Sequence, residues 1–293
     1  MMNKDYLNEF LGYLSTQKRY SKHTINAYKR DINLFFSYVQ QENIVEIDKQ
    51  SIQSYLSFLY IKKSSTATLA RKLAALRSYC NYLSKHKNIN CNFIKTIILP
   101  KKGKSLPDFI HKEDLDILLN LPINSFIELR NSLIIHLLYS TGLRLDELTN
   151  LKVKDYDENS TTFRVIGKGN KERIVIFSNK TNILLKEYLK QRIHICEPFL
   201  LINKNHTKLS NRGVELILKN ISKSYLGHTK LHPHMLRHTF ATKLLNKGMD
   251  IRSLQELLGH ETLAATQIYT HIAKNELLEL YTTYHPRGDN SDI

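Results

Sequence analysis

Apolar residues recur every three to four positions along most of this 293-residue chain, the spacing that predicts amphipathic α-helices. In the first hundred residues the expected helices cover 6–14, 25–39, 52–61 and 68–84. Residues whose side chains cap helices stand before three of them, at Ser21 or Thr24, at Asp48 and within 64–66. The first part of the chain is therefore expected to be a four-helix unit.

A different pattern marks residues 161–177, TTFRVIGKGNKERIVIF. Two β-branched runs flank GKGN, which predicts a β-hairpin with a glycine-bearing turn. Helical spacing surrounds the hairpin, and Gly142 is placed to end a helix. These expected helices cover 111–121, 126–142, 179–194, 211–225, 234–246, 250–258, 262–270 and 274–284. The second part is thus expected to be mixed α/β but mostly helical, with a small antiparallel sheet, in a chain that is mainly α.

The two parts are separated by residues 98–108, ILPKKGKSLPD. Two prolines, one glycine and three lysines without apolar periodicity are typical of an interdomain linker. We therefore expect a helical N-terminal domain over 1–98, a linker over 99–107 and a second domain over 108–293.

Positive charge is concentrated in the first part. The formal net charge of the chain is +16, and residues 1–107 hold 18 basic and 6 acidic residues. This imbalance predicts a surface for a polyanion, most simply the phosphate backbone of DNA or RNA. A solubilising basic surface is the alternative, and a membrane surface fits less well because no basic segment has an apolar Trp/Phe face. Candidate DNA contacts are Arg71, Lys72 and Arg77, opposite a Leu/Ala helix face, and Lys101, Lys102 and Lys104 in the linker.

The cysteines and the apolar runs indicate a cytoplasmic protein. Cys80, Cys91 and Cys196 form no CxxC pair and no disulfide framework, which favours a reducing compartment. No apolar run approaches the ~20 residues that a membrane-spanning helix needs. The N-terminal stretch MMNKDYLNEF does not resemble a secretory signal.

Four segments of the second domain carry residue types suited to phosphoryl chemistry. They are TGLRLDEL (141–148), VIGKGNKER (165–173), HPHMLRHTFATKLL (232–245) and LLGHETLAATQIYTH (257–271). Together they supply Arg144, Lys168, His234, Arg237, His260 and Tyr269.

Each of these residues has an ordinary explanation when taken singly. Tyr269 is one of 16 tyrosines, and its helix position fits a packed aromatic. His234 and His238 have the i, i+4 spacing of metal ligands, but no third ligand follows at a standard spacing, so we expect no metal.

The set as a whole indicates attack on a phosphodiester without a metal. Two arginines can hold phosphate oxygens, a lysine can protonate a leaving oxygen, and histidines exchange protons near neutral pH. A tyrosine can act as the nucleophile.

The four motifs, in this order and spacing, resemble those of the tyrosine recombinases (phage integrase family), and most closely those of the bacterial Xer recombinases. The resemblance covers most of the chain and implies a SAM-like core-binding domain of four helices followed by a catalytic domain. It implies that Tyr269 attacks the scissile phosphate and forms a 3′-phosphotyrosyl link, while Arg144 and Arg237 clamp the phosphate oxygens. Lys168 would protonate the departing 5′ oxygen, His234 would be the general base, and His260 would bond the phosphate. No cofactor is implied, because the phosphotyrosine retains the bond energy.

The resemblance also implies supporting residues near the motifs. Glu147 is expected to orient Arg144 or a histidine, and Lys171 and Arg173 on the hairpin are further DNA-contact candidates. Asp146 departs from the serine or alanine of many relatives, and we expect it to face outward or to pair with a lysine. His238 is expected to be structural.

As partners, the resemblance implies double-stranded DNA with paired inverted half-sites and a homo- or hetero-tetramer around a Holliday junction. The tetramer would be joined by trans docking of the C-terminal helix 274–284, with packing in cis as the alternative. A septal DNA translocase would activate the enzyme if it resolves chromosome or plasmid dimers. Three other roles stay open: integration or excision of a mobile element, a type IB topoisomerase-like activity, and a non-catalytic DNA-binding protein of the same fold.

Overall fold

The computed structural model describes residues 6–42, 48–99, 110–167, 172–192, 194–227, 231–258 and 283–285. The chain divides into two compact units, Met1–Ser105 and Leu106–Ile293. Of the expected linker, residues from 100 onward lie outside the described ranges, and so do 262–270 and most of 274–284. None of the described helices is long and apolar enough to cross a membrane.

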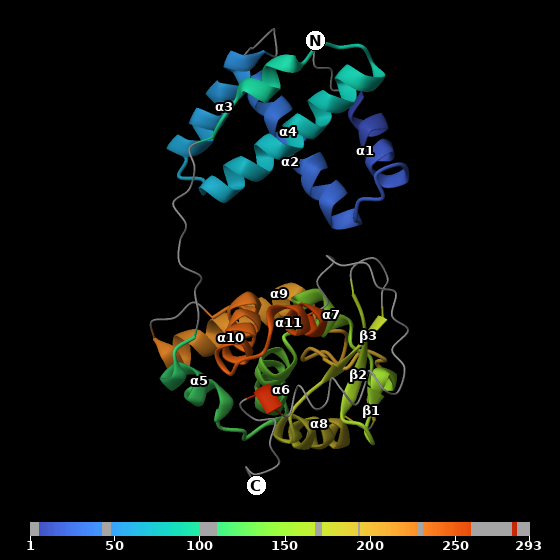
Figure 1. The fold of residues 1–293 in the computed structure, drawn as a ribbon, viewed down its shortest axis with the longest axis vertical. Helices are drawn as coiled ribbons and strands as arrows, with labels where there is room; N and C mark the ends of the chain where they lie inside the picture. The colour runs from blue at the N-terminus through green and yellow to red at the C-terminus, as the bar shows by residue number, and fades with distance from the viewer. Residues whose placement is uncertain are drawn as a thin grey trace. The chain divides into compact units, whose positions relative to one another are not determined.

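The first unit contains the four predicted helices (Figure 1). They are α1 (Leu7–Thr16), α2 (Lys22–Gln41), α3 (Lys49–Ile61) and α4 (Thr66–His86). Ser21 caps α2 by accepting a hydrogen bond from the backbone N–H of Thr24 at 3.2 Å, and Asp48 and Ser65 cap the next two helices in the same way. The caps fix where each helix begins, and the apolar faces then meet in one core around Phe10, Phe35 and Tyr79.

The basic face expected on α4 is only partly correct. Arg71 has a side chain that is 42% exposed, although it pairs with Asp31 of α2. Lys72 is buried, with Nζ at 3.3 Å from Asp31 Oδ1 and 3.4 Å from the Tyr55 hydroxyl. Arg77 is half-buried and donates to the carbonyl of Ile97. The prediction that Lys72 contacts DNA is therefore wrong, because a buried carboxylate on α2 holds its ammonium group inside the unit.

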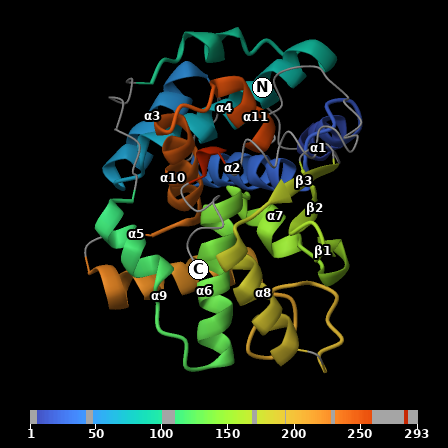
Figure 2. The ribbon, with the colours of Figure 1, turned by 60° about the horizontal axis from the view of Figure 1, so that its bottom comes forward.

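The second unit is built around α6 (Phe126–Thr141), which is buried along most of its length. Figure 2 shows α6 between the strands and α5, and α5, α8 and α10 all pack against it. The other helices are α5 (Lys112–Leu119), α7 (Leu145–Asn150), α8 (Asn179–Gln191), α9 (Asn211–Ile221), α10 (Pro233–Asn246) and α11 (Ile251–Leu258). A turn of π-helix over Ser222–Leu226 follows α9.

A small antiparallel sheet lies beside these helices, in the order β1-β2-β3. The predicted hairpin is confirmed as β2 (Thr162–Ile166) paired with β3 (Glu172–Ile176), and its turn at 168–171 lies outside the described residues. A two-residue strand, β1 (Tyr156–Asp157), adds an edge that the sequence pattern did not predict, since so short a strand has no measurable alternation.

Candidate active site

The site begins at the tight turn between α6 and α7. Gly142 ends α6 with φ of +59°, in the left-handed region that glycine adopts without strain. A Cβ atom at this position would lie 2.6 Å from Cδ1 of Phe240 on α10 and 2.8 Å from Cδ2 of Leu258 on α11. The turn therefore packs tightly against two other helices, and it places Arg144 at the first position before α7.

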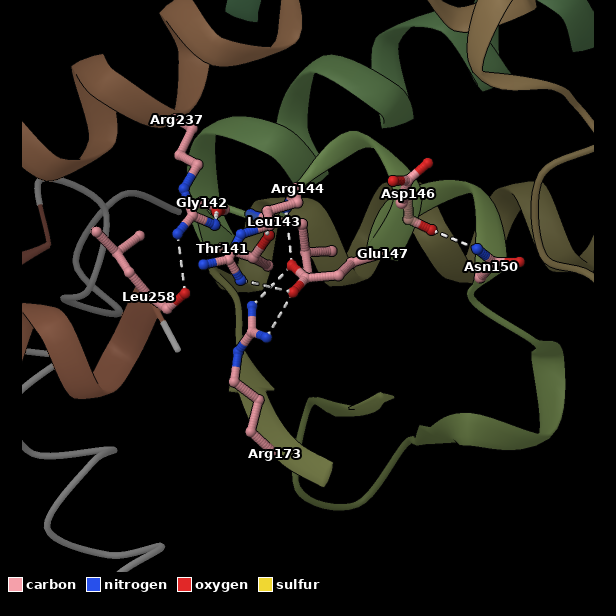
Figure 3. Close-up of polar contacts among 10 residues, drawn as sticks. All are labelled: Thr141, Gly142, Leu143, Arg144, Asp146, Glu147, Asn150, Arg173, Arg237 and Leu258. Atoms are coloured by element: carbon pink, nitrogen blue, oxygen red, sulfur yellow. Dashed lines mark hydrogen bonds and ion pairs between the residues drawn. The ribbon is translucent and has the colours of Figure 1, made fainter. Parts of the chain in front are cut away.

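Glu147 lies at the centre of the polar contacts that follow (Figure 3). Its Oε2 accepts the backbone N–H of Arg144 at 2.8 Å, and its Oε1 accepts Nη1 of Arg144 at 3.0 Å. Arg173 of β3 adds two parallel bonds, Nη1 to Oε1 at 2.8 Å and Nη2 to Oε2 at 2.9 Å. One carboxylate thus holds two arginines from different elements.

The surroundings of Glu147 favour its charged form. Burial by itself raises the pKa of this carboxyl group, but the hydrogen bonds and charge of Arg173, together with the bonds from Arg144, outweigh burial and lower the pKa below its usual 4.5. Glu147 is therefore a carboxylate at neutral pH, and the two arginines bonded to it more than balance its charge.

This lowered pKa links the stability of the second unit to pH. An unfolded chain binds a proton at Glu147 near pH 4.5, whereas the folded chain does so only at lower pH. The contribution of Glu147 is thus fully present above its unfolded pKa and is lost as pH falls through the folded pKa. Below about pH 4.5, we expect the unfolding free energy of the wild-type protein to fall more steeply with decreasing pH than that of Glu147→Gln. The difference between the two slopes should be at most about 1.4 kcal/mol per pH unit, the value for one linked proton. Urea unfolding between pH 3 and 6 measures both slopes, and equal slopes would contradict this assignment.

Arg237 joins the turn to the end of α11. It is 9% exposed, and its guanidinium donates to the carbonyl of Gly142 and, at 2.8 Å, to the carbonyl of Leu258. Burial is the main cause that lowers the pKa of Arg237 to about 10, and the positive charge of Arg144 adds to it. Arg237 still carries its charge at neutral pH. Leu258 is the last residue of α11, so Arg237 also fixes the point from which the chain continues toward His260.

The remaining predicted site residues fall into two groups. His234 is exposed on the first turn of α10, three residues before Arg237, and His238 is half-buried on the same helix. Within the described ranges no three His, Cys, Asp or Glu side chains gather to hold a metal ion. The predicted residues outside the described ranges are Lys101, Lys102, Lys104, Lys168, Lys171, His260 and Tyr269.

Asp146 faces away from the arginines, as expected. Its side chain is exposed and accepts a hydrogen bond from Nδ2 of Asn211 on α9, rather than from a lysine. Figure 3 shows it on the other side of α7 from Arg237, with Asn150 donating to its backbone carbonyl at 2.7 Å. The extra carboxylate therefore does not compete for Arg144.

The structure does not support the prediction that Arg173 contacts DNA. Its side chain is 7% exposed and both of its Nη atoms donate to Glu147. The alternation of side chains along β3 indicates that Arg173 is buried. Residues two apart share a face of a strand, so Arg173 lies on the same face as Val175, which is buried. A buried arginine needs hydrogen-bond acceptors, and the carboxylate of Glu147 supplies two of them.

Comparisons with known proteins agree with this architecture. Residues 108–276 match the model of the phage integrase family, and residues 7–87 match that of the phage integrase N-terminal SAM-like domain. Tyrosine recombinase XerC of Listeria innocua is 38% identical, with 95% of this chain and 97% of that protein covered. XerC of Staphylococcus carnosus is 37% identical over 98% of this chain and 99% of that protein.

A solved structure adds a likeness in three dimensions. The post-cleavage complex of XerH site-specific recombinase bound to palindromic difH substrate is 26% identical to this chain. The match covers 94% of this chain and 83% of that one, with a TM-score of 0.69. The family models, the near full-length relatives and this fold lead to one assignment: the chain belongs to the phage integrase family of tyrosine recombinases.

Proposed function

We propose that this protein cuts and rejoins double-stranded DNA at a specific site through a covalent 3′-phosphotyrosyl intermediate. The observation that carries the proposal is the meeting of two arginines at the Gly142 turn: Arg144 follows Gly142 by two residues, and the guanidinium of Arg237 donates to the Gly142 carbonyl. Two cations in such proximity are stabilised by an anion, and a phosphodiester is the anion that planar guanidinium groups bind best.

The charge balance of the described site supports a phosphate ligand. Among the described residues, Arg144, Arg173 and Arg237 contribute three positive charges, and Glu147, which bonds to Arg144 and Arg173, contributes one negative charge. A bound phosphate would offset the remaining charge. In the transition state, where negative charge on the non-bridging oxygens increases, the stabilisation by Arg144 and Arg237 would grow.

The proposed reaction exchanges one phosphodiester for another. The Tyr269 oxygen bonds to the scissile phosphorus as the bond from phosphorus to the 5′ oxygen breaks. His234 accepts the tyrosine proton, Lys168 gives a proton to the leaving 5′ oxygen, and His260 donates to a phosphate oxygen. The 5′-hydroxyl of a partner strand then attacks the phosphotyrosine by the same steps in reverse, so no external energy source is needed. His234 is exposed at the start of α10.

We infer a role of the Xer type, in the cytoplasm, in resolving dimers of a chromosome or plasmid. The substrate would be DNA with paired inverted half-sites, bound by a tetramer of this chain or of this chain with a paralogue, and a septal DNA translocase would activate it. Near full-length likeness to two XerC proteins supports this role over integration or excision of a mobile element.

We also propose trans docking of the C-terminal helix 274–284 in a neighbouring subunit. His285, the residue directly after that segment, packs within its own chain: its buried ring lies against Tyr139 and Phe240 at centroid distances of 5.6 and 5.8 Å. Lys247 Nζ also donates to the His285 carbonyl at 3.3 Å.

Covalent trapping tests the proposed function. A randomised duplex library with twofold-symmetric arms and a nick in one strand would be incubated with the full chain, so that cleavage near the nick releases a short fragment and leaves the adduct. We expect a detergent-stable protein–DNA adduct on a narrow set of sequences, formed without metal or ATP, with Tyr269 as the modified residue. Paired copies of the selected site in one plasmid should then yield recombinant products. Binding without any adduct would indicate a non-catalytic protein, and adducts with relaxed plasmid but no recombinants would indicate a topoisomerase.

A further inference from the structure

The side chain of Arg173 is committed to a single partner. It lies on the buried face of β3, opposite Val165 of β2, and both of its Nη atoms donate to Glu147. Its Nε has no hydrogen-bond partner among the described atoms. Arg173 therefore acts on its surroundings through Glu147.

Glu147 in turn controls Arg144. With Arg173 bonded to both carboxylate oxygens, the guanidinium of Arg144 reaches Glu147 through one bond, Nη1 to Oε1, and 34% of its side chain stays exposed (Figure 3). A carboxylate without Arg173 would favour a two-bond pair with Arg144, since that is the preferred geometry of an arginine and a carboxylate. Such a pair would turn the guanidinium of Arg144 away from a phosphate.

We infer that Arg173 is a positioning residue for DNA cleavage, which keeps Glu147 neutralised and oriented so that Arg144 is held ready for the scissile phosphate. The inference rests on the proposed function, because it assigns a part of that reaction's site.

The same contact joins two elements of the site. Arg173 belongs to the strand that follows the 168–171 turn in the sequence, and Glu147 belongs to the first turn of α7. Because both side chains are at most 7% exposed and share two hydrogen bonds, the end of β3 nearest the turn is fixed against the helix that Arg144 begins. Displacement of the hairpin would therefore also displace Arg144.

The first test is Arg173→Lys, which keeps the charge but cannot make two parallel bonds. On the nicked duplex selected by covalent trapping, we expect the single-turnover cleavage rate at saturating DNA to fall about a hundredfold, the size of effect that misplacing a reacting group produces. The dissociation constant for DNA and its dependence on salt should not change. A lost phosphate contact would instead reduce the slope of log affinity against log salt by about 0.9.

A matched control separates positioning from a general loss of structure. Arg192 is also a buried arginine of the second unit, 3% exposed, and it donates to the carbonyls of Glu197, Phe199 and Leu200. We expect Arg192→Lys to lower thermal stability but to leave cleavage at saturating DNA within about threefold of the wild-type rate, because Arg192 has no described contact with the arginine cluster.

A double-mutant cycle keeps the test decisive if Arg173→Lys folds poorly. Glu147→Gln with Arg173→Gln removes both buried charges together. In the Glu147→Gln background, Arg173→Gln should slow cleavage by less than about threefold, because the carboxylate through which Arg173 acts on Arg144 is already absent.

Three results would overturn the inference. The first is a wild-type cleavage rate in Arg173→Lys, and the second is a smaller slope of log affinity against log salt in that variant. The third is that Arg173→Gln slows cleavage as much in the Glu147→Gln background as it does in the wild-type protein. The wild-type protein is measured alongside. If it forms no adduct, the proposed function fails, whereas normal cleavage by both wild type and Arg173→Lys rejects the positioning role alone.

Discussion

Replacing Tyr269 with phenylalanine is expected to abolish covalent attachment to DNA while leaving the affinity for the selected site within about twofold. A phenylalanine ring has nearly the size and shape of a tyrosine ring but has no oxygen to attack phosphorus. Affinity should survive because it comes mainly from contacts between cationic side chains and phosphates. Adduct formation is measured by detergent-stable gel shift, and binding by native gel shift of the same samples.

The matched control for this change is Tyr225→Phe, which removes a hydroxyl from a tyrosine of the same unit that is 42% exposed. This variant should form adduct at the wild-type rate. An adduct that persists in Tyr269→Phe would show that another residue is the nucleophile. Loss of both binding and adduct would instead show that Tyr269 supports the structure of the site.

Local features of the fold were predictable because they depend on neighbours in the sequence. Ser21, Asp48 and Ser65 were among the cap positions that were predicted, since a cap bonds to a backbone N–H only three residues away. The β2–β3 pairing followed from two β-branched runs around a glycine turn. Gly142 was likewise predicted as the end of a helix.

The mistaken residues share one cause, a partner far away in the sequence. Lys72 was predicted to be exposed, but it bonds to Asp31, which is 41 residues earlier and 1% exposed. Arg173 bonds to Glu147, 26 residues earlier. Helical or strand periodicity can show that a charged residue lies on a buried face, as it does for Asp31 beside Phe35, but it cannot show which opposite charge will meet it.

The candidate site was predictable as a set of residue types but not as a set of contacts. Arg144, Glu147 and Arg237 meet around Gly142, and the contact of Arg237 with a backbone carbonyl of α11 has no sequence signature. Backbone carbonyl partners depend on how helices pack, which the pattern of side chains does not specify. This is why the role of Leu258 appeared only in the structure.

Arg237→Lys is expected to slow DNA cleavage at saturating DNA by about 10²–10³-fold, the cost of removing one donor that stabilises transition-state charge. The lysine keeps one positive charge but cannot bond to two carbonyls and a phosphate in one plane. Two effects then act together. The phosphate loses a donor, and the contact that fixes the end of α11 at Leu258 is lost. Affinity for DNA should fall far less than the rate, because Arg237 is one of many cationic groups.

Arg130→Lys is the control that decides between a catalytic and a structural cause. Arg130 is 6% exposed, donates to the carbonyl of Ile202 at 3.0 Å, and has a pKa that burial lowers, as it does for Arg237. A variant at Arg130 should therefore share any loss of stability but keep the wild-type rate of cleavage, measured by single-turnover adduct formation. If both variants slow cleavage equally, the effect belongs to packing of the unit. If only Arg237→Lys does, the effect belongs to the site itself, where Arg237 lies beside Arg144 and fixes the end of α11 at Leu258.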